Sequence, residues 1–389
     1  MLFRVLAVAA LLGFSVASAL AVEPTLEIRF HPAGRVHPYP LDSLRGYSAV
    51  VVQNTAIINR GTTPVTLVAV ALELLLGDQA LDARHLVPAD IARSAASGSG
   101  LQSSGMLSLL AFQIGGEALL GGATLAKSAT LAPGEAILFG HQLLSFKGER
   151  DALRVRVAGT SDGTAVEGIG TLPVRATPSR IAYRFPLNGT WFVGAGPSPH
   201  SHHRWVVPQE FAFDIVKLGA DGATHGSNGT KRRQYHAYGA PVLAAADGRV
   251  IAAVHDQPEN DDDLKRPGEN AVAYLTRVKS KQGERLSKGA VAIIGNHVVL
   301  EHAHGEHSVY AHLRPGSLTV KRGDVVKAGQ RLGRLGTSGN STEPHLHFHV
   351  CDGPDPLSCA GVPVQFEDIE LPLADLPRPI QSGDIVTSR

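Results

Sequence analysis

The sequence of 389 residues lacks a charge imbalance, and beyond its first residues it lacks a long apolar run. Lysine plus arginine number 36 and aspartate plus glutamate 35, so the formal net charge is +1. This balance gives no indication of a nucleic-acid ligand. The most apolar later stretch, 106–123, is interrupted by Gln113, Glu117 and several glycines, so we expect no stable membrane span. A content of 43% hydrophobic and 18% charged residues predicts a packed globular protein rather than a disordered one.

Cysteine is scarce too, because the chain has only Cys351 and Cys359. Residues 1–21 are typical of a secretory signal: Arg4 precedes an apolar stretch, and Ala19-Leu20-Ala21 is a small-x-small cleavage site. We therefore expect an exported protein of the periplasm or cell envelope, or a secreted one, with an uncleaved anchor as the alternative. In such a protein an even pair of cysteines this close predicts one disulfide, and a pair of zinc thiolates is the alternative.

The rest of the chain is predicted to be mainly β, in two domains. Residues 22–178 contain short runs rich in Val and Ile between Gly, Asn and Pro turns, which is typical of a β-sandwich. Within them, 88–130 is a Ser/Gly/Leu-rich excursion that is either partly helical or poorly ordered. Residues 179–375 are predicted to form a second, antiparallel β domain, followed by a tail at 376–389. The charged insertion 256–288 is long for a loop, so we expect a mobile segment, with a lid beside a site as the alternative.

Histidine is abundant in the second half, where 14 of the 18 lie between residues 200 and 349. Over 345–350, alternation places three histidines on one face of a predicted strand and apolar residues on the other. Histidines spaced i, i+2 stand about 7 Å apart, so one can bind a metal while the next reaches past it to the group that the metal activates. A polar outer face that happens to be rich in histidine is the alternative.

A carboxylate is expected to join these imidazoles. In Phe211–Ile215 the apolar residues alternate with Asp214, and an aspartate is disfavoured in a strand, so we expect Asp214 to have a partner. A zinc site needs neutral imidazoles, a carboxylate and free imidazoles that handle protons. The candidates are His200, His202, His203, Asp214, His312, His345, His347 and His349. The remaining nearby histidines, His297, His302 and His307, are predicted to lie at the rim or surface, and so is His349.

Three motifs in order carry a resemblance to a known family. They are Tyr310-Ala311-His312-Leu313, then 323–330 (GDVVKAGQ), then 339–348 (GNSTEPHLHF). Together they resemble the lysostaphin/LytM-type zinc metalloendopeptidases, over about residues 180–370. The resemblance implies a barrel-sandwich-hybrid peptidase domain of antiparallel β-sheet, built from a duplicated motif. It also implies bound Zn2+ and the hydrolysis of peptide bonds, mostly in cell walls.

The resemblance assigns roles residue by residue. His347, the second His of His-x-His, corresponds to a zinc ligand and Asp214 to another, while His312 and His345 flank the metal-activated water as catalytic residues. Many members carry a further histidine four residues before the aspartate, where this chain has Glu210. In an extended strand Glu210 would be about 13 Å from Asp214, too far to share an ion.

The first metal ligand is therefore left open. His203 is preferred, because some members draw this histidine from a loop further upstream, and His202 is the next choice. Glu210, if the chain turns there, or no third ligand are the other possibilities.

The function implied is an exported zinc endopeptidase acting on peptidoglycan peptides. The alternative is a catalytically degenerate domain that binds or activates another cell-wall hydrolase, suggested by Glu210. A carrier barrel of the biotin or lipoyl type, suggested by 320–335, leaves the histidines without a role.

Overall fold

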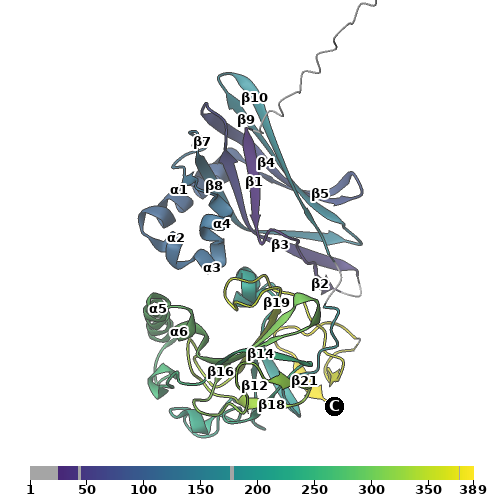
Figure 1. Ribbon diagram of the computed structural model, residues 1–389, viewed down its shortest axis with the longest axis vertical. Coiled ribbons are helices and arrows are strands. Elements are labelled where there is room, and N and C mark those ends of the chain that lie inside the picture. The colour runs from purple at the N-terminus through teal and green to yellow at the C-terminus, as the bar shows by residue number, and fades with distance from the viewer. Residues whose placement is uncertain (1–24, 43–44, 176–178, 376) are drawn as a thin grey trace, which may run out of the picture.

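A computed structural model of the protein describes residues 25–42, 45–175, 179–375 and 377–389. Two β bodies are stacked along the long axis, the first half of the chain above the second (Figure 1). The prediction of a mainly β protein with antiparallel sheets is confirmed. The predicted signal at 1–21 lies outside the described residues.

The first body is a sandwich of two sheets. One has the strand order β1-β3-β8-β6 with β2 beside β3, and the other has the order β10-β9-β4-β5 with β7 beside β4. The strands are β1 Leu26–His31, β2 Tyr39–Asp42, β3 Tyr47–Asn59, β4 Val65–Leu76, β5 Gln79–Leu86, β6 Thr124–Leu125, β7 Thr130–Leu131, β8 Glu135–Lys147, β9 Ala152–Ser161 and β10 Thr164–Pro173.

The excursion at 88–130 is largely helical rather than poorly ordered. It forms α1 Pro88–Ser103, α2 Met106–Leu109, α3 Ala111–Ile114 and α4 Gly116–Leu120. Apolar residues of these helices pack on β3 and β8, in a cluster that includes Ile58, Leu119 and Leu138. Since the main sandwich core covers the other face of β3, that strand is apolar on both faces, as its Val- and Ile-rich sequence predicts.

The second body is built on a sheet with the order β17-β14-β15-β16-β19-β12-β11-β21-β20, beside a small sheet of β13 and β18. The strands are β11 Thr190–Ala195, β12 Phe213–Val216, β13 Pro241–Leu243, β14 Gly248–Val254, β15 Asn296–Glu301, β16 His307–Leu313, β17 Val325–Val326, β18 Arg331–Arg334, β19 Leu346–Cys351, β20 Ile369–Glu370 and β21 Ile385–Ser388. The helical turns are η1 His202–Trp205, η2 Val207–Gln209, η3 Arg232–Gln234, η4 Asp261–Asp263 and η5 Ala303–Gly305.

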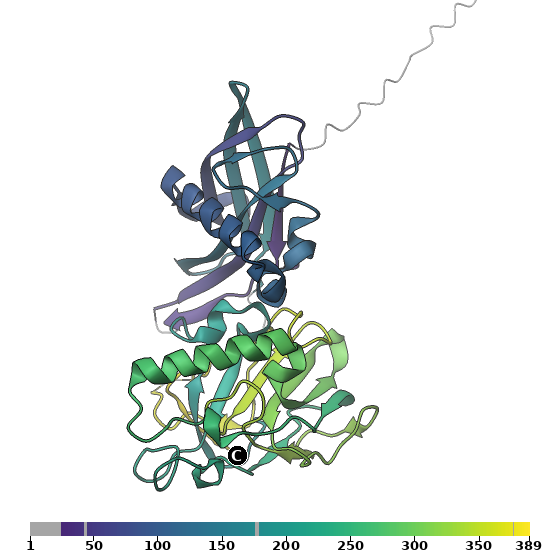
Figure 2. The same ribbon diagram turned by 90° about the vertical axis from the view of Figure 1, so that its left-hand side faces the viewer.

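The charged insertion at 256–288 ends in a regular helix, so it is not a loop throughout. Helix α5 spans Ala271–Lys288, followed by α6 Ala290–Ile294, and α5 crosses one side of the second body (Figure 2). Its charges are paired with the preceding segment: Asp263 accepts from Lys281 and Arg285 at 2.5 and 2.6 Å. No helix within the described ranges is both long and apolar enough to cross a bilayer.

A buried histidine at the junction of the two bodies gives a pH-dependent term in stability. The Nδ1–H of His37 donates to the Arg175 carbonyl at 2.9 Å, and the ring meets Phe211 edge-on. Burial lowers the pKa of His37 from 6.5 to about 4. The unfolded chain therefore takes up this proton near pH 6.5 and the folded chain only near pH 4, so stability is lost as the pH falls through that window.

The loss attributable to His37 should reach about 3 kcal/mol, at about 1.4 kcal/mol per pKa unit. Urea unfolding of the wild type and of His37→Gln at pH 7 and pH 4.5 measures it, since glutamine keeps the donor to Arg175 without titrating. The variant should lose less stability on acidification. Equal losses in the two proteins would contradict the assignment.

Candidate metal centre

Strand register brings the aspartate and the histidine strand together. Strand β12 pairs with β19 so that Asp214 lies directly opposite His347, and β16 on the other side of β19 places Ala311 opposite the same histidine. Directly opposite residues of an antiparallel pair share a face. The intervening Leu346, Phe348 and Val350 are buried in the core. The predicted alternation of β19 is therefore confirmed.

Three of the candidate side chains meet at the Asp214 carboxylate. His347 Nδ1 lies 2.9 Å from Asp214 Oδ1, and His203 Nε2 lies 2.9 Å from Asp214 Oδ2. The His345 Nε2 is 3.5 Å from Oδ1. His203 reaches this point from η1, a short turn of 3-10 helix that begins after Ser201, whose hydroxyl accepts from the His203 N–H.

Hydrogen bonds fix which nitrogen of His203 faces the carboxylate. Its Nδ1 lies 3.1 Å from Gln209 Oε1, an acceptor, so Nδ1 carries the proton and Nε2 presents a lone pair. That buried Nε2 has no hydrogen-bond donor, although a carboxylate oxygen lies beside it. Two acceptors in such close contact are stabilised by a proton or a metal ion between them, and the imidazoles and carboxylate of His203, Asp214 and His347 are ligands of the kinds that zinc binds.

His312 and His345 stand together beside this group, with ring centroids 4.8 Å apart. His312 Nδ1 donates to the Ser338 carbonyl and His345 Nδ1 to the Glu343 carbonyl, each at 2.8 Å, so the neutral rings present Nε2 lone pairs. His312 has φ of 60°, a conformation that costs free energy in a residue other than glycine. Both rings are therefore held in fixed orientations by the backbone.

Neighbouring groups shift the pKa values of Asp214 and His312. Burial alone would raise the pKa of Asp214, but His203 and His345 hold it well below its usual range. Burial, together with the neighbouring His345 and His347, holds the pKa of His312 well below 6.5. The site thus combines a carboxylate that stays ionised with an imidazole that stays neutral at pH 7.

The other proposed first ligands are placed less favourably. The His202 ring lies against the His203 ring at a tilt of 45°, but its Nε2 is 3.9 Å from Asp214 Oδ2 and its side chain is 70% exposed, against 3% for His203. Glu210 does sit where the chain turns, with φ of −49° and ψ of −32°, but its carboxylate is paired with Arg204 at 3.0 Å. Among the described residues, the ligand atoms of His202, His203 and Asp214 lie within 4.8 Å of one another, and neither Glu210 nor His200 joins this group.

Comparison with known proteins identifies the family of the region that holds three of these histidines. The model of peptidase family M23 matches residues 228–358, which include His312, His345 and His347. Residues 228–358 are a peptidase family M23 domain. Asp214 and His203 lie upstream of the matched residues and join the M23 domain through β12 and η1.

Several curated relatives share parts of this region. The chain is 36% identical over 80 residues to the peptidoglycan DD-endopeptidase ShyA of Vibrio cholerae, covering 21% of this chain and 16% of the relative. It is 40% identical over 136 residues to the cell division protein DipM of Caulobacter vibrioides, covering 35% and 16%. A solved structure of the M23 protein EnpA of Enterococcus faecalis is 18% identical, with a TM-score of 0.28, and covers 48% of this chain and 95% of that one. The chain thus spans about a sixth of the length of the curated relatives described.

A cavity of about 520 Å³ in the M23 domain opens onto the histidines. One wall is made by α5 through Tyr274, Leu275 and Val278. Ile294 and Leu357 line the cavity as well, and Phe112 of α3 packs against them from the sandwich. The insertion therefore forms a wall of the groove, as expected for a segment beside a site.

The four histidines that were predicted to lie at the rim or surface are buried, so that prediction is wrong. His297, His302 and His307 are each under 8% exposed, and His302 Nε2 is bonded to Ser308 within the sheet. His349 is 3% exposed, and its Nδ1 lies 3.0 Å from His347 Nε2. The spacing of two residues between His347 and His349 was the sequence signal for their contact. Nothing in the sequence indicated that Gln209 would bond to the His203 ring.

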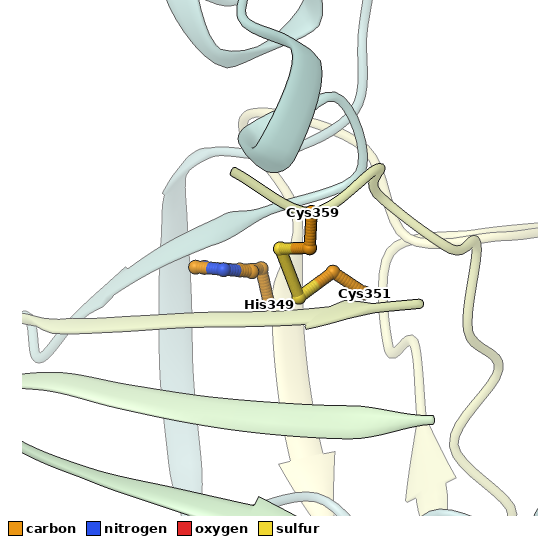
Figure 3. Close-up of side chains that lie close together, drawn as sticks. All are labelled: His349, Cys351 and Cys359. Atoms are coloured by element: carbon orange, nitrogen blue, oxygen red, sulfur yellow. A yellow bond between two sulfur atoms is a disulfide. The ribbon is translucent and has the colours of Figure 1, made fainter. Parts of the chain in front are cut away.

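His349 also lies beside the two cysteines: His349 and Cys351 project from the same side of β19, and Cys359 reaches them from the loop that follows (Figure 3). Cys351 and Cys359 form a disulfide, which confirms the predicted pairing. Since a metal is bound by thiolates and not by a disulfide, this cluster is no second metal site in the oxidised protein.

Removing the disulfide should lower stability without changing the metal content. The bond closes a short loop, with a sequence separation of 8, and such loops restrict the unfolded chain by about 2–3 kcal/mol. Urea unfolding of Cys351→Ser/Cys359→Ser should show a loss of that size, with zinc per chain equal to that of the wild type. A fall in zinc content would contradict a purely structural role.

Proposed function

We propose that the protein is an exported zinc metalloendopeptidase that hydrolyses peptide bonds of peptidoglycan. His203, Asp214 and His347 would hold the zinc ion. The observation that carries the proposal is the meeting of His203 Nε2 and His347 Nδ1 at the two oxygens of one buried carboxylate. The M23 domain and its similarity to relatives named as peptidoglycan DD-endopeptidases support the substrate class.

When bound, zinc would supply Lewis-acid polarisation and a more acidic water. The chain's own residues orient the ligands and move protons. Gln209 Oε1 holds the His203 ring by accepting a hydrogen bond from its Nδ1–H, and His349 faces Nε2 of His347. His312, with Nε2 free, and His345, whose Nε2 faces Asp214 at 3.5 Å, are placed to accept a proton from the attacking water and return it to the leaving amine.

The shape of the groove suits an extended peptide. Its α5 wall supplies apolar contacts from Leu275 and Val278, with Lys279 and Gln282 available for polar groups. The peptidase is proposed to extend over 179–375, with the sandwich at 22–178 as a separate domain.

The second candidate is a degenerate domain that binds or activates another wall hydrolase. It rested on Glu210 in place of a histidine, and in the structure Glu210 is engaged with Arg204 while His203 lies at the carboxylate. The geometry therefore favours the enzyme.

Metal analysis and digestion of purified sacculi test the proposal together. The expected result is one zinc per chain and the release of muropeptides that stops on chelation and returns with zinc. A folded protein that neither binds zinc nor releases muropeptides would leave the binding function as the better account.

A further inference from the structure

The segment that carries His203 is fastened to the sandwich. Gln53 Nε2 of β3 donates to the Arg204 carbonyl at 2.9 Å in a buried contact, and Gln113 Nε2 of α3 donates to the Trp205 carbonyl at 3.2 Å. The His141 ring of β8 also meets the Trp205 ring, with centroids 5.8 Å apart. Both residues that follow His203 are therefore held from the other body of the molecule.

Arg204 forms the centre of this attachment. Its side chain is fully buried, and the guanidinium lies over the rings of Tyr39, from the sandwich, and Phe211, from the second body, at 5.3 and 4.9 Å. Its charge is balanced by Glu210 at 3.0 Å. A buried arginine is tolerated only with such a partner, so the pair and the two rings define one position for η1.

The other two proposed ligands need no such support. Asp214 and His347 lie on β12 and β19, neighbouring strands inside the sheet with hydrogen-bonded partners on both sides. His203 lies on a turn of four residues, and short 3-10 turns have poor internal hydrogen bonding. The position of the His203 ring therefore depends on what holds η1 from outside.

We propose that the sandwich is a structural part of the metal centre, with Gln53 and Arg204 as positioning residues that hold His203 against Asp214. This inference rests on the proposed role of His203 as a metal ligand. It also gives Glu210 a role: the carboxylate that stands four residues before Asp214 balances the arginine that positions the histidine. Any partner that separates the two bodies would then weaken the metal site.

The variant Gln53→Leu tests the proposal from outside the second body. It removes the donor to the Arg204 carbonyl at nearly constant volume. Gln102→Leu is the control, because Gln102 Oε1 accepts from the Leu125 N–H at 2.7 Å within the sandwich, away from η1. In the metal-free protein, amide exchange over 202–205 should be faster in Gln53→Leu than in the wild type. Zinc affinity, measured by chelator competition, should fall about tenfold, as it does when other residues that orient a metal ligand are replaced. Gln102→Leu should leave both unchanged.

Unchanged exchange and unchanged zinc affinity in Gln53→Leu would overturn the proposal. If that variant does not fold, Gln113→Leu, which removes the bond to Trp205, is measured in its place and is expected to shift both readouts in the same direction. A wild type that binds no zinc would refute the proposed function instead. The amide exchange rates of η1 in the wild type and in Gln53→Leu would still decide whether the sandwich holds this segment.

Discussion

Replacing His347 by alanine is expected to abolish stoichiometric zinc binding and to lower kcat/KM for peptidoglycan cleavage about a thousandfold or more. His347 is buried, and its Nδ1 faces Asp214 Oδ1 at 2.9 Å. Its loss would leave one imidazole and one carboxylate for the ion. Lewis-acid stabilisation of a transition state is worth several kcal/mol, and about 4 kcal/mol corresponds to a thousandfold in rate.

His297→Ala is the matched control, because His297 is equally buried in the same sheet but bonds to the Gly295 carbonyl outside the cavity. The control should keep its zinc even if its stability falls. Full cleavage and full zinc content in His347→Ala would refute the assignment of His347 as a zinc ligand.

Replacing His312 by asparagine should separate catalysis from metal binding. The expected result is a fall of about 10²–10⁴ in kcat with zinc content unchanged, since a positioned acid–base group contributes about that much. Asparagine is chosen because it tolerates the positive φ of 60° at this position, so the backbone need not move.

His304→Asn is the control, because His304 has nearly the same φ, 61°, in the exposed turn η5, away from the cavity. It should cleave peptidoglycan at the wild-type rate. If His312→Asn lost zinc in parallel with activity, His312 would be supporting the metal rather than handling a proton.

The parts of the site that obey strand periodicity could be predicted from the sequence. The alternation over 345–350 gave the face on which His345 and His347 lie, and the isolated Asp214 in an apolar strand gave the expectation of a partner. The structure pairs these strands so that Asp214 faces His347. Short Val- and Ile-rich runs likewise predicted the sandwich strands.

The parts that depend on long-range contacts could not be predicted. Nothing local shows that Gln209 would orient His203, or that Arg204 would be buried between a sandwich residue and Glu210. The helix α5 was missed because its sequence is charged and exposed, with its order coming from ion pairs to Asp263 and a place along the cavity. The burial of His349 was missed because it depends on neighbours beyond the local strand pattern, among them the Cys351–Cys359 disulfide.

Anomalous diffraction from zinc-loaded crystals tests the central claim most directly. The account predicts one zinc ion with His203 Nε2, one Asp214 oxygen and His347 Nδ1 each at about 2.0–2.2 Å, and with His312 and His345 unligated beside it. An ion held without His203 or His347, or one bound at a different group of residues, would contradict it.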